Sequence, residues 1–219
     1  MKGTMLVRTL LALTVLTLIG ATAMAEDAKS TITINGGRNT VIMKAPTHVV
    51  NHPIKAPAHP FYDNIGTSGY TEGDGYTVSD GSPIDTEYTP GSGIVSLKSG
   101  TTHKISVGLG FVEGTNGAIV VLDKDCKGIP CGKIDKTNLC KGKVSNLPTF
   151  GSTSTTVVSF NCKVTLKKGK TYWVYIESLA NSWLAWNLSL SATGDVIEGT
   201  NDVWGTPSSG ATVGALTIK

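Results

Sequence analysis

Residues 104–122 read KISVGLGFVEGTNGAIVVL, and this stretch carries the clearest structural pattern of the chain. Its first half alternates small or polar residues with apolar ones, the apolar positions being Ile105, Val107, Leu109 and Phe111. An alternation with a period of two predicts a half-buried β-strand. The dipeptide Asn116-Gly117 is typical of hairpin turns, and the apolar run 118–122 follows it. We therefore predict a strand, a hairpin turn and a return strand.

The same alternation recurs towards the C-terminus. One segment alternates through Val158, Phe160, Cys162, Val164 and Leu166, and another through Leu184, Trp186, Leu188 and Leu190. Residues 172–177 form a further expected strand, and no stretch after residue 25 has the period of an amphipathic helix. Many short strands joined by turns, in a chain with 26 glycines, predict an all-β sandwich or barrel.

The first 25 residues have the three parts of a secretory signal peptide. Lys2 and Arg8 supply positive charge, residues 10–19 form an apolar run, and Ala23-Met24-Ala25 offers the small residues of a cleavage site. The apolar run is far shorter than the roughly 20 residues that a membrane-spanning helix needs. We therefore expect cleavage after Ala25 and a secreted or periplasmic protein, without membrane insertion after signal cleavage.

Charge gives no reason to expect a nucleic acid or an anionic membrane as the partner. Loss of Lys2 and Arg8 removes two of the 19 basic residues, against 16 acidic ones, so the mature chain is close to neutral. A nucleic-acid groove needs clustered lysine and arginine side chains.

Residues 26–60 differ from the rest of the chain. Residues 30–34 and 41–43 predict two short strands, whereas residues 44–60 hold prolines at 46, 53, 57 and 60, which favour extended chain. We expect a signal peptide over 1–25, an N-terminal strand and Pro/His-rich linker over 26–60, and a β-sandwich domain over 61–219. His48, His52 and His59 are of a type that binds copper or zinc, but their spacing among prolines favours a solvated linker.

The four cysteines predict disulfide bonds, because their number is even and the chain is expected to be exported. Their spacing does not form the paired knuckles of a zinc site. Four cysteines can form two disulfide bonds in three different ways. The turn Lys127-Gly128-Ile129-Pro130 can bring its two flanking cysteines together, which favours Cys126–Cys131 and leaves Cys140–Cys162.

Several motifs occur in an order that resembles the exported bacterial choice-of-anchor domains. They are Tyr62-Asp63-Asn64-Ile65-Gly66, Asp123-Lys124-Asp125-Cys126-Lys127-Gly128-Ile129-Pro130-Cys131-Gly132, Leu166-Lys167-Lys168-Gly169-Lys170-Thr171-Tyr172-Trp173, and the later Trp186 and Trp204. The resemblance covers roughly residues 61–218. It implies a jelly-roll-like antiparallel β-sandwich at a cell surface or in an extracellular matrix, without established catalytic residues. The chain departs from the family by its cysteines and by the lack of a C-terminal sorting anchor.

Acidic residues in glycine-rich turns are weak candidates for a calcium site. Asp123 and Asp125 begin a loop that starts like an EF-hand, but Lys127 and Ile134 stand where that loop needs oxygen ligands. A different site would combine Asp123 or Asp125 with Asp80 or its acidic neighbours. Ordinary turn chemistry explains the same residues, so we expect no cofactor.

The aromatic residues of 172–177 are the candidate binding residues. Trp173, Tyr175 and Glu177 share one face of the expected strand, and a glutamate is rarely buried without a partner. We therefore predict that Trp173 is at least partly exposed and that this face stacks against sugar rings. Trp186 and Trp204 are expected in the core.

These observations favour a non-catalytic binding or surface-interaction module. A Ser-His-Asp triad is not expected, because His103 is the one histidine in the strand-rich region and no Gly-x-Ser-x-Gly motif occurs. No pair of carboxylates occurs in a motif that indicates a glycosidase. The expected partner is a polysaccharide or a cell-surface protein. The alternatives are a structural component of an extracellular matrix or envelope, and a secreted hydrolase.

Overall fold

The computed structural model describes residues 31–34, 41–44, 49–50, 60–66, 69–132, 137–152, 157–200 and 203–219, with only the backbone of the first three segments. The expected signal peptide and His48, His52 and His59 lie outside the described residues. No helix of the described part has the length and apolar composition of a membrane span.

The described chain is built of strands. They are β1 (Thr31–Ile34), β2 (Val41–Lys44), β3 (Val49–Val50), β4 (Tyr62–Asp63), β5 (Tyr70–Asp80), β6 (Glu87–Val95), β7 (Gly100–Thr101), β8 (Lys104–Gly114), β9 (Gly117–Lys124), β10 (Cys140–Ser145), β11 (Val157–Asn161), β12 (Thr165–Leu166), β13 (Thr171–Ser178), β14 (Ser182–Thr200), β15 (Val203–Trp204), β16 (Ser208–Gly214) and β17 (Leu216–Ile218).

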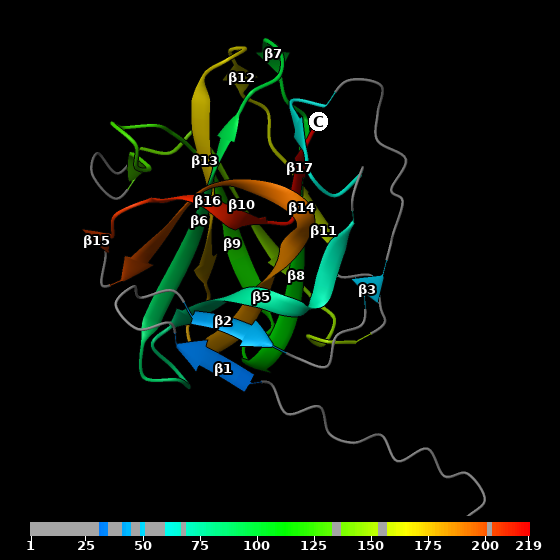
Figure 1. Ribbon diagram of the computed structural model, residues 1–219, viewed down its shortest axis with the longest axis vertical. Coiled ribbons are helices and arrows are strands. Elements are labelled where there is room, and N and C mark those ends of the chain that lie inside the picture. The colour runs from blue at the N-terminus through cyan, green and yellow to red at the C-terminus, as the bar shows by residue number, and fades with distance from the viewer. Residues whose placement is uncertain are drawn as a thin grey trace, which may run out of the picture.

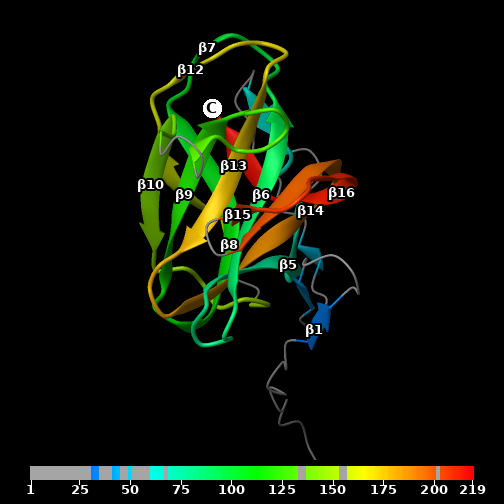
Figure 2. The same cartoon turned by 90° about the vertical axis from the view of Figure 1, so that its left-hand side faces the viewer.

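The strands form the two layers of an antiparallel sandwich, which confirms the predicted fold class. One layer has the order β10-β9-β13-β6, and Figure 2 shows these strands side by side. The other layer has the order β5-β14-β8-β17-β4, with β11 also paired to β8. The layers are continuous where the ends of β5 and β6 pair, at Ser79 with Tyr88 and Asp80 with Glu87.

The long strand β14 belongs to both layers. Its first half pairs with β5 and β8, and its second half, from Val196, pairs with β6. Against β16 its register shifts between Leu188 and Thr193, where it passes from one layer to the other. Figure 1 shows β14 crossing the front of the molecule beside β16.

The predicted hairpin of residues 104–122 is wrong in its pairing, although both strands exist. β8 pairs with β14, β17 and β11, whereas β9 pairs with β10 and β13, so the turn joins the two layers. Both strands carry an apolar face, and a sandwich buries two such faces by stacking them rather than by placing them edge to edge. Asn116 anchors a different loop, since its side chain exchanges hydrogen bonds of 2.9 and 2.6 Å with the Leu147 backbone.

The main core lies between the layers. It contains fully buried Val107 and Leu109 of β8, Leu122 of β9, Val174 of β13 and Trp186 of β14. The predicted alternation is therefore confirmed in these strands. Trp186 packs so tightly that a Cβ at Gly214 would lie 2.2 Å from its ring, and its Nε1 donates a 3.0 Å hydrogen bond to the Ala215 carbonyl.

Strands also occur in the N-terminal segment. β1 falls within the predicted strand 30–34, β2 covers the predicted strand 41–43 and also Lys44, and the two strands pair with each other. β2 also pairs with β5, and so does β3, which lies inside the Pro/His-rich segment. Part of the expected linker therefore extends the β5 side of the sandwich.

Candidate functional site

The predicted exposure of the Trp173 face is wrong, because its aromatic residues are buried. Trp173 and Tyr175 are each 1% exposed, and Glu177 is half-buried at the far end of β13. The alternation itself is right: Tyr172, Val174 and Ile176 face the main core, and Trp173 and Tyr175 face the other way. That outer face is covered by a second, smaller core, which sequence alternation within one strand cannot reveal.

Two segments cover this outer face. β15 supplies Trp204, whose ring meets Tyr175 edge to face at 5.0 Å, and the end of β14 supplies Ile197. The loop after β9 supplies Ile129 and an acceptor, because Trp173 Nε1 donates a 2.8 Å hydrogen bond to Asp125 Oδ1. Exposures of 0% for Trp186 and 9% for Trp204 confirm that both are core residues.

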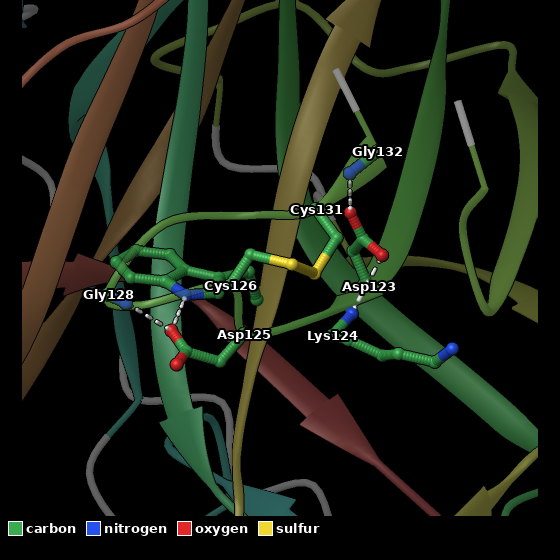
Figure 3. Close-up of a disulfide and its surroundings, with 8 residues drawn as sticks. Asp123, Lys124, Asp125, Cys126, Gly128, Cys131 and Gly132 are labelled. Atoms are coloured by element: carbon green, nitrogen blue, oxygen red, sulfur yellow. Dashed lines mark hydrogen bonds between the residues drawn. A yellow bond between two sulfur atoms is a disulfide. The ribbon is translucent and has the colours of Figure 1, made fainter. Parts of the chain in front are cut away.

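Both predicted disulfides are confirmed. Cys126 bonds Cys131 with their Cα atoms 5.1 Å apart, and Cys140 bonds Cys162 with a Cα separation of 5.9 Å. Figure 3 shows the first bond closing the loop that carries Asp125 and Gly128. Asp125 of this loop is the hydrogen-bond acceptor of Trp173. The described cysteines are thus all oxidised, which fits an oxidising compartment outside the cytosol.

The candidate calcium carboxylates do not come together. Asp123 is buried and accepts backbone hydrogen bonds from Lys124 and Gly132 at the ends of the disulfide loop (Figure 3). Asp80 accepts from Asn181 beyond the other end of β13, so at least roughly 16 Å of strand separates it from Asp123. Within the described residues, no group of three His, Cys, Asp or Glu side chains is placed to hold a metal ion.

An open groove of about 510 Å³ lies on the outer face instead, where β14 changes layers. Beyond its pairing at Ser92 and Val196, β14 diverges from the end of β6, and the space between them is the groove. Tyr62 and Asp63 of β4 also line the groove. β4 is held beside the segment after β6 because the Leu97 amide donates a 2.9 Å hydrogen bond to the carbonyl of Phe61, the residue before β4. Thr171, one pleat before Trp173 on the same face of β13, also lines the groove.

The groove combines apolar and hydroxyl-bearing walls. Its apolar wall includes Val95 and Leu97, which are 52% and 60% exposed. Hydroxyl groups line it at Tyr62, Thr171 and Thr193. Such a surface suits a ligand that offers both C–H faces and many hydroxyl groups.

Tyr62 is the aromatic side chain of this groove. Burial raises the pKa of its phenol, the Asp63 charge raises it further, and a hydrogen bond from Asn64 opposes the change. The phenol therefore stays protonated at neutral pH and keeps a hydroxyl that can donate a hydrogen bond. Oδ1 of Asp63 accepts hydrogen bonds from the amides of Ile65 and Gly66 and from the Thr217 hydroxyl, at 2.7–3.0 Å.

Lysines gather at the end of the sandwich that borders the groove. We call this the basic end, and it comprises Lys98, Lys104, Lys163, Lys167, Lys168, Lys170 and Lys219. Hydrogen bonds join the segments that carry them, for example from the Lys168 amide to Ser99 and from the His103 amide to the Lys219 carbonyl. β7, β12 and the C-terminus mark this end at the top of Figure 1.

A half-buried carboxyl lies elsewhere, at a small crevice between β6 and β14. Burial raises the pKa of Glu198 to about 8. The pKa of neighbouring Tyr76 is raised to about 12, first by burial and then by the charge of Glu198. The Tyr76 hydroxyl donates a hydrogen bond to the Thr212 carbonyl. The crevice holds only about 10 Å³, so it has no room for a substrate.

Sequence reasoning missed the groove residues. Tyr62 and Asp63 belong to a motif that carries the family resemblance, but nothing in their pattern marks a ligand site. Val95, Leu97 and Thr193 meet only because β14 changes layers beside β6. No family model, no curated protein and no solved structure matches the chain.

Proposed function

We propose that the protein is an exported, non-catalytic binding module that holds a polysaccharide chain in the groove between β4, β6 and β14. The supporting observation is the lining itself, in which the Tyr62 ring and the exposed Val95 and Leu97 lie among threonine hydroxyls. Sugars present apolar C–H faces to rings and aliphatic groups, and hydroxyls to polar ones. The groove is open to solvent, so part of a polymer can enter it.

Export supports the same proposal. The sequence begins with the pattern of a signal peptide, and two disulfides fit an oxidising compartment. A polysaccharide of a cell surface or extracellular matrix is a polymer that such a protein meets. The resemblance to choice-of-anchor domains agrees with this setting.

A retention assay with a groove-filling variant tests the proposal. Mature protein is incubated with a panel of insoluble neutral and acidic polysaccharides, and bound protein is measured after washing. Thr193 is exposed in the groove, so Thr193→Trp should fill it and weaken retention about tenfold or more. Val203, which is 67% exposed and lies outside the groove, provides the matched control Val203→Trp.

We expect Val203→Trp to bind like the natural chain. Equal retention of both tryptophan variants would remove the groove as the binding site, and retention on no polysaccharide would overturn the function. Release of reducing ends by the natural chain would instead favour the hydrolase.

A further inference from the structure

We infer that the polysaccharide is an acidic one, whose carboxylates contact the basic end while the sugar chain lies in the groove. This inference rests on the proposed function and specifies its ligand. The two surfaces are continuous along the chain, because Leu97 of the groove precedes Lys98 and Thr171 follows Lys170. They are also joined in space by a 3.0 Å hydrogen bond from the Ser96 amide to the Lys170 carbonyl.

The basic end has a large excess of positive charge. Asp63 is the one acidic side chain in the described segments 60–63, 95–104, 162–171 and 217–219, and its Oδ1 accepts three hydrogen bonds. Asp195 also lines the groove, where its Oδ1 accepts a hydrogen bond from the Ser209 hydroxyl. Lys163, Lys167, Lys168 and Lys170 are exposed, and none of them forms an ion pair within the described residues. Clustered charge of one sign attracts an oppositely charged ligand and concentrates it at the surface.

The basic end is not visible in the composition of the chain, which is close to neutral, because the fold places basic side chains together and most acidic side chains elsewhere. The loops that connect β6 to β8 and β11 to β13 carry lysines, and short backbone ladders hold these loops together: β7 pairs with β12, and the Gly169 amide donates to the Ser96 carbonyl. Lys98 is fixed beside the groove, with its Nζ 4.4 Å from the centre of the Phe61 ring. The loops that carry the lysines are therefore held beside one another by backbone hydrogen bonds.

The accompanying groove favours an acidic polysaccharide over other polyanions. Single-stranded nucleic acid is bound by stacking successive bases on several aromatic rings, whereas Tyr62 is the one aromatic side chain that lines this groove. The exposed Val95 and Leu97 line a concave wall, so they do not project to enter a lipid surface. Lysines act as point charges that attract both carboxylates and phosphates, so the preference for a sugar polymer rests on the lining of the groove.

Polygalacturonate and its methyl ester provide a matched pair of probes, since esterification removes the charge and keeps the chain. Binding of the mature protein to each polymer, and to alginate, is measured at 50 and 300 mM NaCl. We expect the ester to bind at least about tenfold more weakly than the acid, and added salt to weaken binding of the acid but not of the ester.

Two double variants test whether the lysines of the basic end contact the acidic polymer. Lys167→Glu with Lys168→Glu should weaken binding of the acidic polymers about tenfold or more without a change in melting temperature, because both side chains are exposed. Lys141→Glu with Lys143→Glu makes the same charge change on β10, three strands from β6, and should alter binding by less than about twofold.

The outcomes separate this inference from the proposed function. Equal binding of acid and ester, still lost in Thr193→Trp, would overturn the acidic ligand and leave the groove intact as a polysaccharide site. Equal loss in the two lysine variants would also overturn the role of the basic end. Binding to no polysaccharide, with capture of single-stranded DNA or of phosphatidylglycerol vesicles, would overturn both proposals.

Discussion

The indole Nε1 of Trp173 donates a 2.8 Å hydrogen bond to Oδ1 of Asp125, which joins a buried strand to an exposed disulfide loop. The same oxygen accepts a 3.1 Å hydrogen bond from the Gly128 amide within that loop. One carboxylate therefore orients the loop and satisfies the polar atom of a buried tryptophan. This contact turns the expected open face of β13 into a second core.

Trp173→Ala should destabilise the fold about as much as Trp186→Ala, each by about 3–5 kcal/mol, because both remove a fully buried indole. Urea unfolding of the two variants measures the loss. Val203→Ala, at an exposed position, should leave the free energy of unfolding nearly unchanged. A Trp173→Ala variant as stable as the natural chain would contradict the second core.

Asp125→Ala should cost about 1–3 kcal/mol, because the Trp173 Nε1 loses its acceptor. Asp125→Asn retains a side-chain oxygen at the same place and should cost less than about 1 kcal/mol. Urea unfolding and the tryptophan fluorescence spectrum report the two effects. Equal destabilisation by both substitutions would mean that the charge, and not the hydrogen bond, is what matters.

Removal of the Cys140–Cys162 bond by two serine substitutions should destabilise the protein more than removal of Cys126–Cys131. The sequence separations are 22 and 5 residues, which correspond to about 3 and about 2 kcal/mol in the chain-entropy model. Denaturant unfolding of the two double variants tests the order. The reverse order would indicate that the short loop contributes mainly through its packing on Trp173.

Stability should decrease as the pH rises through the range set by Glu198. Its pKa is about 8 in the folded protein, against an ordinary value of 4.5. Below pH 4.5 both states are protonated. Between pH 4.5 and 8 the unfolded chain loses this proton first, so the Glu198 contribution to the free energy of unfolding falls, and above pH 8 it is constant.

Glu198→Gln should abolish that contribution, because glutamine does not titrate. Unfolding of both proteins at pH 5 and pH 8.5 provides the comparison, and the variant should gain stability relative to the natural chain at the higher pH. Tyr76, with its pKa near 12, does not titrate in this range. Parallel pH profiles of the two proteins would contradict the raised pKa.

The mature N-terminus should be Glu26, as the cleavage pattern Ala23-Met24-Ala25 predicts. Intact-mass measurement of the exported protein tests this directly. Met1 retained in that material would refute export by this signal.

The sequence by itself determined the β-strands and their buried faces. The alternation around Val107, Leu109, Val174 and Trp186 predicted which side chains enter the main core, because the pleat sends successive residues to opposite faces. The pairing of Cys126 with Cys131 followed in the same way from a short turn. Each of these depends on residues that are near neighbours in the chain.

Only the tertiary structure decided which strands pair and what covers each face. Residues 104–122 have the composition of a hairpin, yet their two strands lie in different layers, because their apolar faces stack across the core. Trp173 shares a face with Glu177 and is nevertheless buried, because Asp125 and Trp204 reach it from distant segments. The groove and the basic end arise likewise, from the crossing of β14 and from loops that meet only in the folded chain.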